Sequence, residues 1–120
     1  RAPKLKKEHG LIDWSQNADR VARQIRAMQP WPTAYTYLHR AGKPAIRLMI
    51  ARTGKASQVP GGTAGTVFTD PAGAWCVRTG EGTAVEVIEV QPAGKKRMPV
   101  SEFLRGHPCG EGDRVGPETP

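Results

Sequence analysis

The sequence has no long hydrophobic run, and this absence excludes one broad class of protein. None of its apolar stretches approaches the ~18 residues that a membrane-spanning helix needs. The start of the chain is basic, but no apolar segment follows it, so we do not expect a secretory signal. The first residue is Arg1 rather than Met, which suggests a piece cut from a longer protein.

Cysteine is scarce as well, with Cys76 and Cys109 as the only 2 among 120 residues. Two cysteines are too few for the disulfide framework of a small secreted domain. We therefore expect a cytoplasmic protein with free thiols, although the pair would also allow one disulfide. Neither cysteine belongs to a Cys-x-x-Cys motif, and the 3 histidines share no motif spacing, so no metal site is predicted.

Side chains suited to catalysis are also lacking. An active site needs a nucleophile beside a base, paired carboxylates or a metal cluster, and no segment supplies one. Asp13 precedes a predicted helix, where a carboxylate stabilises the helix dipole. The stretches 80–82 and 110–112 both read Gly-Glu-Gly, but they lack the strand–turn–helix setting of a phosphate-binding loop and are interpreted as turns. We expect no catalytic residue in this chain.

Glycine and proline, in contrast, are abundant, at 14 and 11 residues. They favour short elements joined by turns, and the length suits one domain. A helix is predicted over residues 16–28, with Ser15 as its N-cap and Pro30 and Pro32 beyond its end. Its apolar face follows the helical period and consists of Ala18, Val21, Ala22, Ile25 and Met28.

In the rest of the chain apolar and polar residues alternate over short stretches, which is typical of short β-strands. Strands are predicted over 34–40, 45–52, 64–69, 74–79 and 83–90, and a short helix over 100–105. Residues 53–62 are predicted to be a loop. In the last strand the apolar face changes sides between Val87 and Ile88, which predicts a β-bulge.

Strands flanked by helices, without β–α–β alternation, predict a mostly β fold, a small antiparallel β-barrel with an N-terminal helix and a short C-terminal helix. The expected core includes Val21, Ile25, Ile46, Leu48, Val67, Val77 and Val85. Residues 1–13 are predicted to be a basic linker or arm, and residues 107–120 a polar C-terminal tail that frays. No apolar heptad pattern indicates an obligate dimer, so we expect a monomer.

Positive charge is the most informative feature, with 18 Lys and Arg against 11 Asp and Glu and a net charge of +7. The cations are grouped along the chain, which favours a polyanionic partner over a merely solvated surface. The groups are Lys4, Lys6 and Lys7; Lys43, Arg47, Arg52 and Lys55; and Lys95, Lys96 and Arg97. Because few aromatic residues are available for stacking (Trp31, Tyr35, Tyr37 and Trp75 at most), contact with the backbone of a folded RNA is favoured over reading of a single strand.

Several short motifs also occur in an order and at gaps that resemble the C-terminal region of methionyl-tRNA formyltransferases, from about residue 3 to residue 106. They are Lys4-Leu5-Lys6-Lys7-Glu8, Ile12-Asp13-Trp14-Ser15, Gln29-Pro30-Trp31-Pro32-Thr33-Ala34-Tyr35, Gly65-Thr66-Val67, Thr79-Gly80-Glu81-Gly82 and Gln91-Pro92-Ala93-Gly94-Lys95-Lys96-Arg97-Met98. Two features depart from that family: Pro99 stands where it usually has a helix-capping Ser, and residues 53–62 are not typical, which makes Lys55 a weaker RNA contact than Lys95 or Lys96.

The resemblance implies that residues 14–106 form an OB-like (oligonucleotide/oligosaccharide-binding) tRNA-binding domain. Its implied partners are initiator Met-tRNA and an N-terminal Rossmann-like domain of the parent chain, which holds the catalytic residues and the folate pocket. The parent enzyme would use 10-formyltetrahydrofolate as co-substrate, and this chain would bind no cofactor. The expected RNA-binding residues are Lys4, Lys6, Lys7, Lys43, Arg47, Lys95, Lys96 and Arg97.

Two alternatives stay open. Similar C-terminal domains follow formyltransferase domains that act on amino sugars or in folate metabolism, where no RNA binds. The second alternative is a free-standing OB-type RNA-binding module, and the missing initiator Met argues against it.

One prediction follows from the missing catalytic side chains. The purified chain, mixed with Met-tRNA and 10-formyltetrahydrofolate, is expected to give no formylation in an assay of formylmethionyl-tRNA. Measurable product would overturn this expectation.

Overall fold

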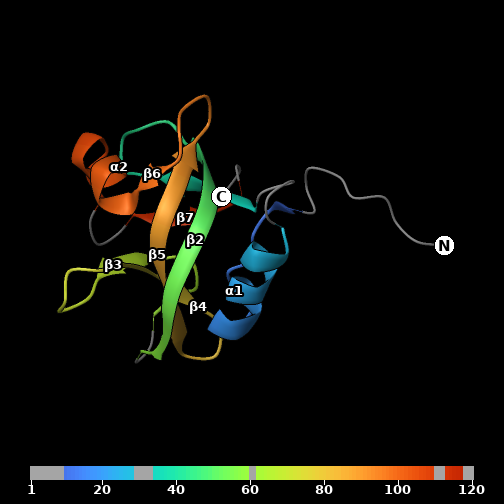
Figure 1. Ribbon diagram of the computed structural model, residues 1–120. Helices are drawn as coiled ribbons and strands as arrows, with labels where there is room; N and C mark the ends of the chain where they lie inside the picture. The colour runs from blue at the N-terminus through green and yellow to red at the C-terminus, as the bar shows by residue number, and fades with distance from the viewer. Residues whose placement is uncertain (1–9, 29–33, 60–61, 110–112, 118–120) are drawn as a thin grey trace.

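The computed structural model describes residues 10–28, 34–59, 62–109 and 113–117. These residues form an antiparallel sheet curled into a nearly closed barrel, with one helix along its side and a second near one end (Figure 1). The elements are α1 (Ala18–Ala27), β1 (Tyr35–His39), β2 (Ile46–Gln58), β3 (Val67–Thr69), β4 (Trp75–Thr79), β5 (Thr83–Pro92), β6 (Met98–Pro99), α2 (Val100–Gly106) and β7 (Arg114–Gly116). The predicted mostly β barrel with two flanking helices is confirmed.

Helix α1 begins two residues later than predicted because its cap is Asn17 rather than Ser15. The Asn17 side chain accepts a hydrogen bond from the Arg20 N–H at 3.0 Å. The Ser15 hydroxyl instead donates to Asp13 Oδ1 at 2.5 Å, so it belongs to the turn before the helix. The expected helix stop at 30–32 lies outside the described residues.

The start of α1 is fixed to the β4–β5 turn by backbone contact. The Gly80 N–H donates to the Gln16 carbonyl at 2.8 Å, and the Ala18 N–H donates to Thr83 Oγ1 at 3.0 Å. A Cβ at Gly80 would lie 1.8 Å from the Ser15 carbonyl oxygen, so a side chain has no room there. This close approach explains the glycine, and it agrees with the interpretation of residues 80–82 as a turn.

The barrel is closed by a strand that the sequence did not indicate. The strand order is β3-β4-β5-β2-β1-β7, and β7 pairs with β1 through Leu38 and Val115. On its other side β7 reaches the segment before β3, where the Val115 N–H donates to the Gly65 carbonyl at 2.7 Å. Strand β7 thus connects the two edges of the sheet.

The expectation that residues 107–120 fray is therefore wrong for 114–116. Val115 is 4% exposed and belongs to the hydrophobic core. A strand of three residues is too short to show an alternation of apolar and polar side chains. Its stability comes from partners far away in the sequence. Residues 110–112 and 118–120 lie outside the described part of the chain.

Strand β2 also differs from expectation, because it continues to Gln58 through the segment predicted as a loop. Its second half pairs with β5, with Ala56 opposite Val85 and Ser57 opposite Ala84. Residues 54–58 are exposed, so their polar sequence is typical of a loop although residues 56–58 pair with β5.

The predicted bulge in β5 is confirmed. Thr53 pairs with Val87 and Arg52 with Glu89, so Ile88 is an extra residue on β5. This extra residue allows Val85, Val87 and Val90 all to be buried. Further register shifts on β2 bend the long β2–β5 ribbon, which helps the sheet to curl.

The core fills the barrel and the space beneath α1. Six of the residues predicted for it are buried: Val21, Ile25, Leu48, Val67, Val77 and Val85. Ile46 is the exception, since it lies at the first position of β2 and is only partly buried. The Trp14 indole N–H donates to the buried Thr36 hydroxyl at 3.0 Å, and that hydroxyl donates to the Gly116 carbonyl. This chain of bonds ties the N-terminal segment to β1 and β7.

Helix α2 has no side-chain cap, as expected from Pro99 at that position. Its Phe103 is 1% exposed, and the ring of His107 stacks on it with centroids 4.7 Å apart. The buried Phe103 side chain, and not a side-chain cap at its N-terminus, therefore holds the helix on the barrel.

Closure by β7 gives a stability prediction. Val115→Ala removes two buried carbons and is expected to lower the free energy of unfolding by about 2 kcal/mol. Val59→Ala, the same change at a half-buried position, should cost clearly less. Urea denaturation measures both variants; equal losses would contradict the closing role of β7.

Candidate nucleic-acid interface

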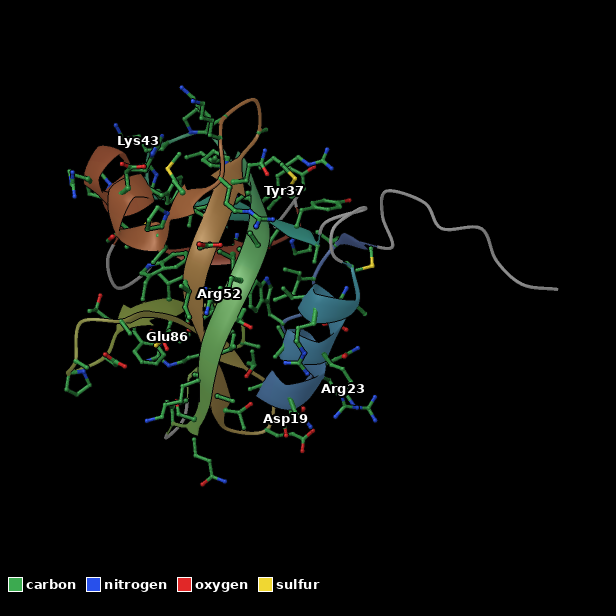
Figure 2. The ribbon with its side chains drawn as sticks, viewed as in Figure 1. Asp19, Arg23, Tyr37, Lys43, Arg52 and Glu86 are labelled. Atoms are coloured by element: carbon green, nitrogen blue, oxygen red, sulfur yellow. The ribbon has the colours of Figure 1, made fainter. Side chains whose placement is uncertain are left out.

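Two loops bearing predicted RNA contacts lie at the same end of the barrel. One is the β1–β2 turn, which holds Lys43, and the other is the β5–β6 loop over residues 93–97. The Ala93 N–H donates to the Arg47 carbonyl at 3.1 Å, which places the start of β2 beside the end of β5. Figure 2 shows Lys43 at the end of the barrel from which the β5–β6 loop protrudes, whereas Asp19 and Glu86 lie lower.

The β5–β6 loop is held in a defined turn. The Lys95 N–H donates to the Pro92 carbonyl at 2.9 Å, and Gly94 has a φ of 77°, which favours glycine at that position. The Gln91 side chain donates to the Lys95 carbonyl at 3.0 Å and closes the loop from below. Gln91 was not singled out from the sequence, where a glutamine before Pro-Ala-Gly carries no signal of this role.

The loop presents its cations to solvent. Lys95, Lys96 and Arg97 are all exposed, as is Lys43. Arg97 Nη1 lies 4.0 Å from Glu89 Oε1, with side chains 51% and 32% exposed, which makes a weak, solvent-screened pair. Within the described part of the chain, the three lysines have no ion-pair partner. Their charges are therefore available to an anion.

Arg47 is placed differently from the lysines. Its guanidinium carbon lies 4.2 Å from the centroid of the Tyr35 ring. Tyr35 in turn meets Tyr37 edge to face, with centroids 6.0 Å apart. Arg47 thus belongs to an aromatic cluster on β1 and β2 as well as to the cationic end of the barrel.

The remaining predicted contacts are not gathered there. Lys4, Lys6 and Lys7 lie outside the described residues. Lys55 is exposed on the second half of β2, where its N–H donates to Glu86 Oε1 at 3.3 Å, well away from the β5–β6 loop. Of the aromatic residues considered for stacking, Trp75 is 3% exposed and belongs to the core.

Asp13 has a structural role in the turn before α1. Hydrogen bonds from the Ser15 hydroxyl, and next from the Ser15 N–H, hold the pKa of this carboxyl below its usual value. Among the described residues, no group of three or more His, Cys, Asp or Glu side chains is arranged to hold a metal ion.

Both thiols are free, as expected. Burial, with a smaller contribution from Asp70 and Glu86, raises the pKa of Cys76 to about 11. Burial also raises the pKa of Cys109 to about 11, with Asp113 adding to the effect. Because these values exceed the 9.0 of a free thiol, the thiols favour the folded state below pH 9, and this contribution is lost as the pH rises towards 11.

Comparison with known proteins places the chain in a family. A model described as "Formyl transferase, C-terminal domain" matches residues 4–108. The chain belongs to the formyl transferase C-terminal domain family.

Several relatives of this chain are named methionyl-tRNA formyltransferase. A methionyl-tRNA formyltransferase of Magnetococcus marinus is 46% identical over 116 residues, which cover 96% of this chain and 34% of that protein. Those of Halalkalibacterium halodurans and Bacillus subtilis are 41% and 38% identical, over 88% and 96% of this chain and 32% and 35% of each relative. The chain thus spans about a third of the length of the curated relatives it matches.

Neither helix in the described residues has the length and the apolar character that a membrane crossing requires.

The thiols give a reactivity prediction. At pH 8 a thiol with a pKa of about 11 is ionised roughly a hundredfold less than one at 9.0, so native Cys76 and Cys109 should react slowly with a disulfide reagent. Unfolding without reductant should release two fast-reacting thiols, counted by absorbance. Finding none would mean that they form a disulfide.

Proposed function

We propose that this chain is the tRNA-binding, OB-like C-terminal part of a methionyl-tRNA formyltransferase. The parent enzyme would transfer a formyl group from 10-formyltetrahydrofolate to the methionine of initiator tRNA in the cytoplasm. The chemistry would belong to its N-terminal catalytic domain, and this part would act as a monomeric module within the parent chain.

The observation that supports RNA binding most strongly is the meeting of separate cationic segments at one end of the barrel. Lys43 and Arg47 come from the β1–β2 hairpin, and Lys95, Lys96 and Arg97 from the β5–β6 loop. Neighbouring like charges repel each other, and salt at physiological ionic strength screens this repulsion only at separations beyond ~8 Å. A polyanion bound there would relieve that repulsion.

The kind of contact follows from the side chains. Lysine ammonium groups are compact, hydrated charges that attract phosphates without reading bases. The loop would therefore supply affinity and position, and selection of the initiator tRNA would come mostly from the catalytic domain. Lys4, Lys6 and Lys7 remain predicted contacts in the same role.

A salt titration of tRNA binding by fluorescence anisotropy tests this function. If roughly four to six phosphates are neutralised, log K should fall against log salt with a slope near −0.9 per phosphate, and Kd should be in the ~10⁻⁴–10⁻⁶ M range at physiological salt. Lys95→Ala/Lys96→Ala should weaken binding to all tRNAs alike and flatten the slope by about two.

The matched control is Arg20→Ala/Arg23→Ala, which removes the same charge from exposed positions on α1. In Figure 2 Arg23 lies on the side of α1 that faces away from the sheet. Its slope should remain close to that of the unmodified chain. If the lysine variant keeps the original affinity and slope, the assignment of the loop fails, and a C-terminal domain of a sugar or folate formyltransferase becomes the better reading.

A further inference from the structure

The aromatic cluster beside the cationic loop is not explained by phosphate contact. Tyr35 and Tyr37 alternate on β1 and so lie on one face, and their partners in the register on β2 are Met49 and Arg47. Their rings meet edge to face at 6.0 Å. The inward-facing neighbours on the same strands, Leu38 and Leu48, are fully buried, so the tyrosines lie on the outer face of the barrel.

The two tyrosines are not equivalent. Tyr35 is 8% exposed and carries the Arg47 guanidinium over its ring. Tyr37 is half-buried, and its hydroxyl makes no hydrogen bond to any residue that the structure describes. Because Tyr37 is only half-buried among the residues that the structure describes, part of its ring is available to a ligand.

Arg47 offers a second planar surface. A guanidinium that lies over one aromatic ring can present its opposite face to another planar group. Arg47 is only half-buried, and its carbonyl accepts the hydrogen bond from Ala93 at the base of the loop that holds Lys95 and Lys96. A planar group resting on Tyr37 or Arg47 would therefore have cations close by.

We propose that Tyr37 and Arg47 form a stacking platform for one unpaired nucleobase of the bound RNA, while the neighbouring lysines contact the phosphates beside it. This inference rests on the proposed RNA-binding function and adds a base contact to it. Unpaired bases stack on aromatic rings and on arginine planes, and this stacking is tolerant of base identity.

A second arginine–aromatic pair elsewhere on the barrel provides the comparison. Arg78 lies 4.6 Å from the centroid of the Phe68 ring, but Arg78 Nη1 is also bonded to the Thr66 hydroxyl at 3.1 Å. The groove beside Phe68 is lined by the carboxylates Asp70 and Glu86 and by a single cation, Lys55, so its net charge is negative and repels phosphates. The Phe68 pair thus has the same chemistry in a setting that disfavours RNA.

The test uses two RNA probes: a single-stranded oligoribonucleotide carrying one 2-aminopurine, and a blunt, fully paired RNA duplex of the same length. Tyr37→Ala should lower affinity for the single strand by about 5- to 150-fold and leave duplex binding unchanged. The salt slope should not change, because the ring carries no charge. Quenching of 2-aminopurine on binding should be lost as well.

Tyr37→Phe keeps the ring and should bind as the unmodified chain does, which separates stacking from the hydroxyl group. Unchanged duplex binding by Tyr37→Ala shows that this variant is folded. Arg47→Lys keeps the charge but loses the plane, and should weaken only single-strand binding. Phe68→Ala is the matched control and should change neither probe.

The outcomes separate this inference from the function on which it rests. If Tyr37→Ala and Arg47→Lys both leave single-strand binding unchanged while Lys95→Ala/Lys96→Ala still flattens the salt slope, the stacking platform is wrong and the RNA-binding function stands. If Tyr37→Phe weakens binding as much as Tyr37→Ala, the ring is not the contact and the platform is also wrong. If the lysine variant has no effect either, the proposed function itself fails.

Discussion

Backbone pairing between β2 and β5 is the interaction on which the other features depend. These two strands are the longest in the described chain and form the ribbon visible at the centre of Figure 1. One end of their register places Leu48 opposite Pro92, which brings Arg47 to the base of the cationic loop. The other end places Gln58 opposite Thr83, whose hydroxyl accepts from the N–H of Ala18 at the start of α1. One register therefore positions both the candidate interface and the helix.

Features governed by local sequence could be predicted. The helical period over Val21 and Ile25, the alternation in the strands and the change of face at Ile88 are consequences of neighbouring residues, and each is found in the structure. The missing cap of α2 also follows from one residue, Pro99. The cationic groups could also be identified from the sequence, because the charge of a Lys or Arg side chain follows from the residue type alone.

Features that depend on distant partners could not be predicted. Residues 54–58 are polar and exposed, and only the facing strand β5 makes them a strand. β7 has three residues, and its burial of Val115 depends on β1 and on Gly65. The same limitation applies to the interface: Arg47 and Lys95 are almost fifty positions apart in the sequence, and only the fold brings Arg47 to the base of the loop that holds Lys95. The cluster of Arg47 with Tyr35 and Tyr37 also depends on the register of β1 with β2.

Closure of the barrel by β7 has a consequence for how the protein is made. The Thr36 hydroxyl donates to the Gly116 carbonyl across 80 positions of sequence. Because a ribosome delivers the chain from its N-terminus, β1 leaves the ribosome long before the strand that covers its outer edge. Until residues 114–116 are synthesised, that edge has unpaired N–H and C=O groups, which are the sites where nascent β-sheets associate with other chains. Strand β7 thus protects the edge of β1, and the nascent barrel depends on residues that are synthesised 80 positions after Thr36.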